Sequence, residues 1–164
     1  MDATELYNLG VEAYEKKDFT AAVKYFKQSA EQGDLDACNC IGNCYIFGEG
    51  VDENYSEAFK WYMKAAEQGL DIAQVNVGTC YCLGNGVKKN NKESFRWFSK
   101  AAENGYAYAQ FMVGLFYEGG FKGVIKADSE SKEKAKEWYI KAAEQGYEEA
   151  KDRLLRLKNL EETQ

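Results

Sequence analysis

The side chains of this sequence that carry reactive chemistry are five cysteines and many carboxylates, because histidine is absent. Without histidine the chain cannot build a Ser-His-Asp or Cys-His catalytic apparatus or a histidine-ligated metal site. The cysteines are Cys38, Cys40, Cys44, Cys80 and Cys82. An odd number cannot pair completely within one chain, so at least one thiol is expected to be free.

The spacing of the cysteines favours a structural role over a metal site. Each close pair, Cys38 with Cys40 and Cys80 with Cys82, is separated by one residue, whereas a zinc ribbon separates its pairs by two. We expect free thiols that act as small buried hydrophobes in a reducing compartment. The alternative is a thiolate metal or redox site, because Cys40 and Cys44 lie one helical turn apart. No basic cluster is visible that would lower their pKa values, so no metal ligand is assigned.

The carboxylates do not form a recognisable catalytic constellation. None falls in an apolar setting beside a partner carboxylate, and acidic side chains on helices are normally solvated. We therefore expect no enzymatic activity, no catalytic residue and no cofactor. The formal net charge of −6 and the pI of about 4.9 argue against a nucleic-acid partner or an anionic membrane surface.

The N-terminal residues and the hydropathy pattern predict a cytoplasmic protein. Acidic residues, Asp2 and Glu5, occupy positions where a signal peptide would carry positive charge. No segment approaches the roughly 18 consecutive apolar residues of a membrane span, so we expect no direct membrane insertion.

Internal repetition is the strongest pattern in the chain. The string Ala-Ala-Glu-Gln-Gly at 65–69 returns at 142–146, and with one substitution at 101–105. Two sets of glycines recur every 36 residues, namely Gly33, Gly69 and Gly105, and Gly42, Gly78 and Gly114. A fixed period of this length indicates a repeat architecture.

Each repeat contains two segments whose apolar residues follow the helical spacing i, i+3, i+4, i+7. The first helices are expected at 37–47, 73–83 and 109–117, and the second helices at about 56–68, 93–104 and 132–145. Asn54 and Asn90 are the expected N-caps of second helices, and glycines are expected to end both helices. The glycine inside each first helix, as at Gly78, is expected where two helices approach closely, because glycine there costs about 1 kcal/mol relative to alanine.

The two ends of the chain depart from this pattern, as terminal repeats do. Residues 4–35 are expected to form a helix pair with a shorter connection. Residues 119–131 are expected to form a surface loop. Residues 148–160 predict an amphipathic helix whose leucines cap the stack. The recurring aromatic residues Trp61, Trp97 and Trp138, and Tyr45, Tyr81 and Tyr117, are expected in the core.

The repeat closely resembles the Sel1-like repeat. The copy at 37–69 contains Ile41-Gly42, Tyr45, Gly48-x-Gly50-Val51, Trp61-Tyr62, Lys64-Ala65-Ala66 and Gly69. The copies at 73–105 and 109–146 keep most of these positions, and residues 4–35 resemble the related tetratricopeptide repeat. The resemblance implies an all-α fold, an α/α right-handed superhelical solenoid of helix pairs with a C-terminal capping helix, in a single domain over 1–164. It also implies an adaptor role in protein complexes.

Sel1-like proteins include a secreted, cysteine-rich subgroup that has been linked to β-lactam binding. In that subgroup, as the resemblance implies, cysteine pairs bridge the two helices of each unit. In this chain Ala30, Ala66 and Ala102 occupy the position of one bridging cysteine. The resemblance therefore does not extend to the disulfides of that subgroup.

A helical wheel gives the candidate binding face. On the first helix Ala37, Ile41 and Cys44 point to one side, and the opposite side is expected to face the concave groove. The residues on that opposite side are Asn39, Asn43, Ile46, Val75, Thr79, Cys82, Phe111, Leu115 and Glu118.

Within this face, Val75, Phe111 and Leu115 are expected to form an exposed apolar stripe that takes an extended peptide or a partner helix. The alternative is that the C-terminal helix or the loop at 119–131 covers the stripe. The sequence thus predicts a non-enzymatic adaptor, monomeric rather than oligomeric, with a protein or peptide partner. Two other hypotheses stay open: a self-assembling structural solenoid, and a hydrolase or small-molecule binder like the cysteine-rich subgroup.

Overall fold

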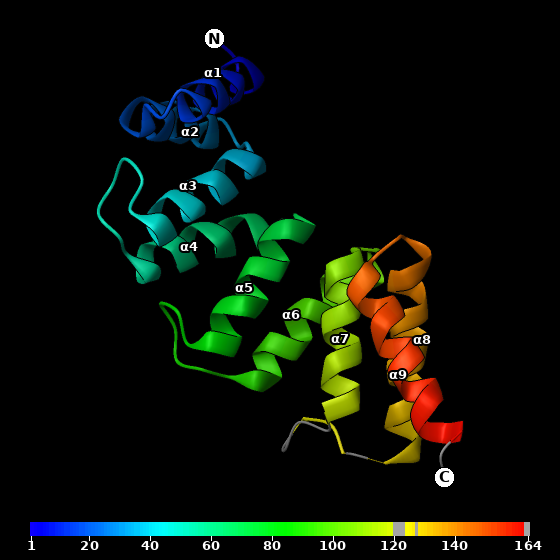
Figure 1. Ribbon diagram of the computed structural model, residues 1–164. Helices are drawn as coiled ribbons and strands as arrows, with labels where there is room; N and C mark the ends of the chain where they lie inside the picture. The colour runs from blue at the N-terminus through cyan, green and yellow to red at the C-terminus, as the bar shows by residue number, and fades with distance from the viewer. Residues whose placement is uncertain (120–123, 127, 163–164) are drawn as a thin grey trace. The chain divides into compact units, whose positions relative to one another are not determined.

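The computed structural model describes residues 1–119, 124–126 and 128–162, with side chains up to residue 159, and within these residues the regular structure is entirely helical. The described part of the chain contains nine helices, which are labelled in Figure 1. They are α1 (Ala3–Glu15), α2 (Phe19–Glu31), α3 (Leu35–Phe47), α4 (Tyr55–Ala66), α5 (Asp71–Leu83), α6 (Asn91–Glu103), α7 (Ala107–Gly119), α8 (Ser129–Glu144) and α9 (Glu148–Glu162). The predicted all-α class is confirmed. None of these described helices is both long enough and apolar enough to cross a bilayer.

The contacts divide the chain into two compact units, Met1–Lys89 and Asn90–Gln164. In the first unit α1 packs on α2, α2 on α3, α3 on α4 and α4 on α5. In the second unit α6 packs on α7, α7 on α8 and α8 on α9. Within each unit, consecutive helices therefore pack on one another, as expected for tandem repeats.

The helix boundaries follow from the capping residues. The Asn54 and Asn90 side chains accept hydrogen bonds from the backbone N–H of Glu57 at 3.0 Å and of Glu93 at 3.2 Å, as predicted. Gly48 ends α3 with a φ of 68° in the left-handed region. The helices α3, α5 and α7 begin two residues earlier than predicted, and at α3 a side-chain cap further upstream explains the difference. At α3, for example, Asp34 accepts the N–H of Ala37 at 3.0 Å.

The region of the predicted loop at 119–131 lies partly outside the described residues. Its described end corrects the prediction, because α8 begins at Ser129 rather than at residue 132. The Asp128 carboxylate accepts the N–H of Ser131 at 2.9 Å and so caps the helix before the predicted start.

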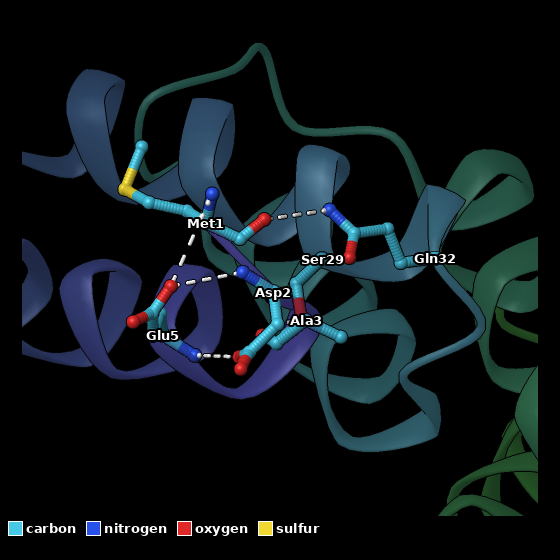
Figure 2. Close-up of polar contacts among 6 residues, drawn as sticks. All are labelled: Met1, Asp2, Ala3, Glu5, Ser29 and Gln32. Atoms are coloured by element: carbon cyan, nitrogen blue, oxygen red, sulfur yellow. Dashed lines mark hydrogen bonds and ion pairs between the residues drawn. The ribbon is translucent and has the colours of Figure 1, made fainter.

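The start of α1 is fixed to the end of α2 by polar contacts (Figure 2). Asp2 accepts the backbone N–H of Glu5 at 2.8 Å, and Glu5 accepts that of Asp2 at 2.9 Å, which makes a complete capping box. The Ser29 hydroxyl donates to the backbone oxygen of Ala3 at 2.7 Å, and the Gln32 amide donates to that of Met1 at 3.4 Å. These bonds give the first helix pair a defined register.

A glycine packed on an aromatic ring joins helices within the repeats. A Cβ added at Gly42 would lie within 2.6 Å of the Tyr62 ring, and one at Gly114 within 2.6 Å of the Tyr139 ring. Gly10 faces Phe26 at the same separation. Because real Cβ atoms do not approach rings this closely, only glycine allows these helices to pack as they do. The predicted close approach is confirmed at Gly42 and Gly114.

The recurring tryptophans are only partly core residues, which corrects the prediction. Trp97 is buried, but Trp61 and Trp138 are half-buried, as are the recurring tyrosines. In every copy a lysine three residues later lies over the indole ring, at 5.2 Å for Lys64, 4.1 Å for Lys100 and 4.1 Å for Lys141. The aliphatic stem and the cation–π contact of this lysine take the place of deeper burial.

Candidate binding face

The nine residues of the predicted binding face lie on α3, α5 and α7, three on each helix. The helices α3 and α5 belong to the first unit, whereas α7 belongs to the second. Within the first unit the structure brings α3 and α5 together on this side, because the Asn76 amide donates to the Asn39 side-chain oxygen at 2.8 Å.

On α3 and α5 the predicted residues are less accessible than expected. Val75 is only 7 % exposed and Asn39 only 6 %, so the expectation of an exposed stripe that includes Val75 is wrong. Asn43 and Thr79 are half-buried and already hydrogen-bonded. The Tyr62 hydroxyl donates to the Asn43 side-chain oxygen at 2.7 Å, and the Thr79 hydroxyl donates to the Val75 backbone oxygen at 2.9 Å. The other two residues, Ile46 and Cys82, are half-buried.

On α7 the predicted apolar residues pack against the C-terminal helices. Phe111 and Leu115 contact a buried cluster formed by Ala135, Tyr139, Ala142 and Ala150, together with Leu154 and Leu157 of α9. The Phe111 ring centroid lies 5.7 Å from that of Tyr139 and 5.2 Å from that of Tyr147. The alternative that the C-terminal helix covers these residues therefore matches the structure of this unit, in which both are half-buried.

Glu118, the remaining predicted residue, is also engaged within the second unit. Its carboxylate accepts the Tyr139 hydroxyl at 2.5 Å and the Arg153 guanidinium at 3.3 Å. Burial, followed by the hydrogen bond to Glu118, raises the pKa of Tyr139 above its ordinary value. The carboxylate thus has both a donor and a cation inside the chain, which leaves little of its charge for a ligand.

The first unit contains a pocket that no pattern in the sequence indicated. It has a volume of about 270 Å³ and lies between α1 and α3. Its lining residues are Val11, Tyr14, Glu15, Phe26, Cys40 and Asn43, of which only Asn43 was predicted. The glycine of the first helix does recur in this repeat, but Gly10 and Gly42 are 32 residues apart instead of 36. That offset places Val11 at the repeat position of Asn43.

The pocket is apolar inside and acidic at its edge. The buried Phe26 contributes its ring, and the Tyr14 hydroxyl donates to the Glu49 carboxylate. This hydrogen bond, with burial, raises the pKa of Tyr14 to about 12, and burial raises the pKa of the Cys40 thiol. Both groups are therefore neutral at pH 7, and Glu15 is the lining residue that carries a formal charge.

The cysteines serve mainly as buried apolar residues. All five are free thiols, and Cys38, Cys44 and Cys80 are buried, which confirms the prediction for these three. Burial raises the pKa values of Cys44 and Cys80 to about 11, so their thiolates are disfavoured. The other two cysteines, Cys40 and Cys82, are half-buried. In the described residues no three potential ligands gather in a way that would hold a metal ion.

Comparison with known proteins agrees with this architecture. The sequence profile of the Sel1 repeat matches residues 3–34, 35–70, 71–106 and 107–147. These matches cover most of the chain, which therefore belongs to the Sel1 repeat family. The match at 3–34 includes the N-terminal pair, for which the sequence analysis predicted a tetratricopeptide-like helix pair.

Two solved structures are similar over nearly the whole chain. The protective antigen c5321 of uropathogenic Escherichia coli, which displays an SLR fold, is 32 % identical with a TM-score of 0.83 over 94 % of this chain. A Sel1 repeat protein from Oxalobacter formigenes is 36 % identical with a TM-score of 0.80 over 91 % of this chain. The chain spans 33 % of the first structure and 57 % of the second.

A curated relative matches over a shorter stretch. The Helicobacter pylori protein named "Putative beta-lactamase HcpC" is 38 % identical over 52 residues, which is 32 % of this chain and 18 % of that protein. The chain therefore corresponds to a small part of this relative.

Proposed function

We propose that this chain is a non-enzymatic adaptor that binds a peptide or a partner helix on the face formed by α1 and α3. The pocket between these helices is the observation that carries the proposal. Its volume of about 270 Å³ lies below the roughly 300–1,000 Å³ of sites that enclose a drug-sized molecule, so it suits one side chain of a larger partner. An apolar pocket that receives one anchor side chain is a common feature of protein recognition.

Three observations support a non-enzymatic adaptor, which we further propose to be cytoplasmic. The chain lacks histidine, and burial raises the pKa of the Cys40 thiol at the pocket, which makes it a weak nucleophile. Five unpaired cysteines suit a reducing compartment such as the cytoplasm. The name of HcpC concerns a protein of which this chain matches 18 %, so it gives weak support for a β-lactam binder.

The proposal is tested by filling the pocket. Val11 is a half-buried lining residue, and the Val11→Trp substitution should occupy the pocket. Gln28→Trp on α2 is the matched control, because Gln28 is exposed and does not line the pocket. Both variants and the parent are first shown to be helical and to melt cooperatively by circular dichroism. They are then used to select from a display library of short random peptides.

Peptides retained by the parent and by Gln28→Trp but lost with Val11→Trp are the expected result. Equal retention by the parent and Val11→Trp would move binding away from this pocket and refute the proposal. Failure to select any peptide with the folded parent would refute it as well.

A second candidate function, self-assembly, is favoured by exposed apolar side chains in the second unit. Leu155 on α9 is 59 % exposed and Ile140 on α8 is 46 % exposed. Exposed apolar groups on helix surfaces are suited to contacts between copies. A mass that rises with concentration in light scattering, and that returns to the monomer value in Leu155→Lys, would favour this function.

A further inference from the structure

The charges of this chain are segregated between the two kinds of helix. The first helices of the repeats, α1, α3, α5 and α7, contain no lysine or arginine, whereas each of α2, α4, α6 and α8 contains at least two. The acidic residues on the first helices are Glu5, Glu12, Glu15, Asp36, Asp71 and Glu118. All formal charges that these first helices themselves contribute to a surface are therefore negative.

The carboxylates beside the pocket have no cationic partner in the described part of the chain. Many other acids are paired, for example Glu12 with Lys16 at 2.5 Å. Glu15 lines the pocket without an ion pair, and Glu49 accepts only the neutral Tyr14 hydroxyl there. Two negative charges thus lie next to an apolar pocket, and the chain supplies no counter-charge of its own.

Exposed apolar side chains extend the same surface in the first unit. Phe47 at the end of α3 is 68 % exposed, and Leu83 at the end of α5 is 62 % exposed. The two occupy equivalent positions 36 residues apart, so they recur with the repeat. On a helical wheel Phe47 lies about 40° from the pocket residue Asn43. The surface therefore combines an apolar pocket, apolar side chains at the helix ends and unpaired carboxylates.

We infer that the partner bound on this face is a basic, apolar peptide segment, with lysine or arginine residues flanking one apolar anchor. The inference rests on the proposed function and specifies its ligand. The anchor enters the pocket against Phe26, and the flanking cations meet Glu15 and Glu49. An acidic peptide would place like charges beside these carboxylates, and a nucleic acid would bring phosphates to an anionic surface.

The first test reads the composition of the peptides selected by the parent protein. Enrichment of lysine, arginine and one central apolar residue over the unselected library is the expected result. A selected pool that is neutral or acidic, yet still lost with Val11→Trp, would overturn the inference and leave the proposed function standing. A pool that Val11→Trp retains unchanged would overturn both.

The second test removes the two carboxylates without changing their size. The Glu15→Gln/Glu49→Gln variant keeps an oxygen that accepts the Tyr14 hydroxyl. The control is Glu31→Gln/Glu67→Gln, which removes two exposed carboxylates at the ends of the second helices α2 and α4. A synthetic peptide taken from the selected pool is titrated by fluorescence anisotropy against both variants and the parent, at low and at high salt.

The pocket variant should bind this peptide about two- to thirtyfold more weakly than the parent, since exposed charge pairs differ widely in strength. It should also lose less affinity when salt is raised, because two of the screened charge pairs are gone. Equal affinity and an equal salt dependence in the pocket variant and its control would overturn the assignment of Glu15 and Glu49.

Discussion

Replacing Gly42 by alanine is the most direct test of the packing in the first unit. On an exposed helix this change would stabilise the chain by about 1 kcal/mol, because alanine is the better helix former. Here the new Cβ would lie within 2.6 Å of the Tyr62 ring, which is only 4 % exposed and cannot move freely. The ring must shift, and its hydrogen bond to Asn43 at 2.7 Å is strained or lost.

The expected magnitude follows from three opposing contributions. Overpacking a tight core costs about 1–3 kcal/mol, and loss of one hydrogen bond costs about 1 kcal/mol. The gain in helix propensity offsets about 1 kcal/mol of this. Gly42→Ala should therefore lower the free energy of unfolding by about 1–3 kcal/mol, measured by urea unfolding followed by circular dichroism.

A second variant distinguishes the ring contact from a general intolerance of the site. In a Tyr62→Val background the ring is absent, so Gly42→Ala should become neutral or stabilising by up to about 1 kcal/mol. The parent, the two single variants and the double variant complete the cycle. An equal loss in both backgrounds, or a gain in the parent background, would refute the packing account.

Three further predictions follow from the first unit. Gly86→Ala should destabilise by about 2 kcal/mol or more in urea unfolding, because Gly86 has a φ of 70° and an added Cβ would clash with the Tyr55 carbonyl oxygen. Burial raises the pKa of Cys44 from 9.0 to about 11, so its contribution to stability is complete below pH 9 and is lost as the pH rises to 11. Between pH 7.5 and pH 10, the free energy of unfolding of the parent should therefore fall by roughly 1 kcal/mol more than that of Cys44→Ala. The half-buried Cys40 thiol should react with a thiol reagent under native conditions before the buried Cys80, and mass spectrometry of digested samples checks the order.

Most of the fold could be predicted from the sequence because its signals are local. The period of 36 residues, the Asn caps and the glycine at Gly42 each report a backbone requirement that neighbouring residues cannot change. The boundary errors are also local. The structure begins α8 at Ser129 because Asp128 caps it, and a cap upstream of the apolar pattern is easily overlooked.

The sequence could place the predicted binding face on its helices, but it could not show whether the residues of that face are exposed. A helical wheel gives the direction of Val75 and Phe111, but not what packs over them. Val75 is buried, and the Phe111 ring packs on Tyr139 of α8 and on Tyr147 in the connection between α8 and α9. The exposure of a side chain depends on residues of other repeats that pack over it. The sequence of a single repeat contains no information on those residues. The pocket was missed because the first repeat is shorter than the others.

The segregation of charge between the two kinds of helix is visible in the sequence. The structure gives a packing role to lysines of the second helices but gives no cationic partner to the carboxylates beside the pocket. Lysines on the second helices make contacts within the fold, because Lys64 and Lys100 lie over tryptophan rings of their own helices. These lysine contacts on the second helices do not explain why carboxylates lie beside the pocket. Glu15 and Glu49 make no ion pair in the described residues, and Glu49 accepts a hydrogen bond only from the neutral Tyr14 hydroxyl there. Two carboxylates that lie beside an apolar pocket without a cationic partner in the described residues are what a cationic peptide would require.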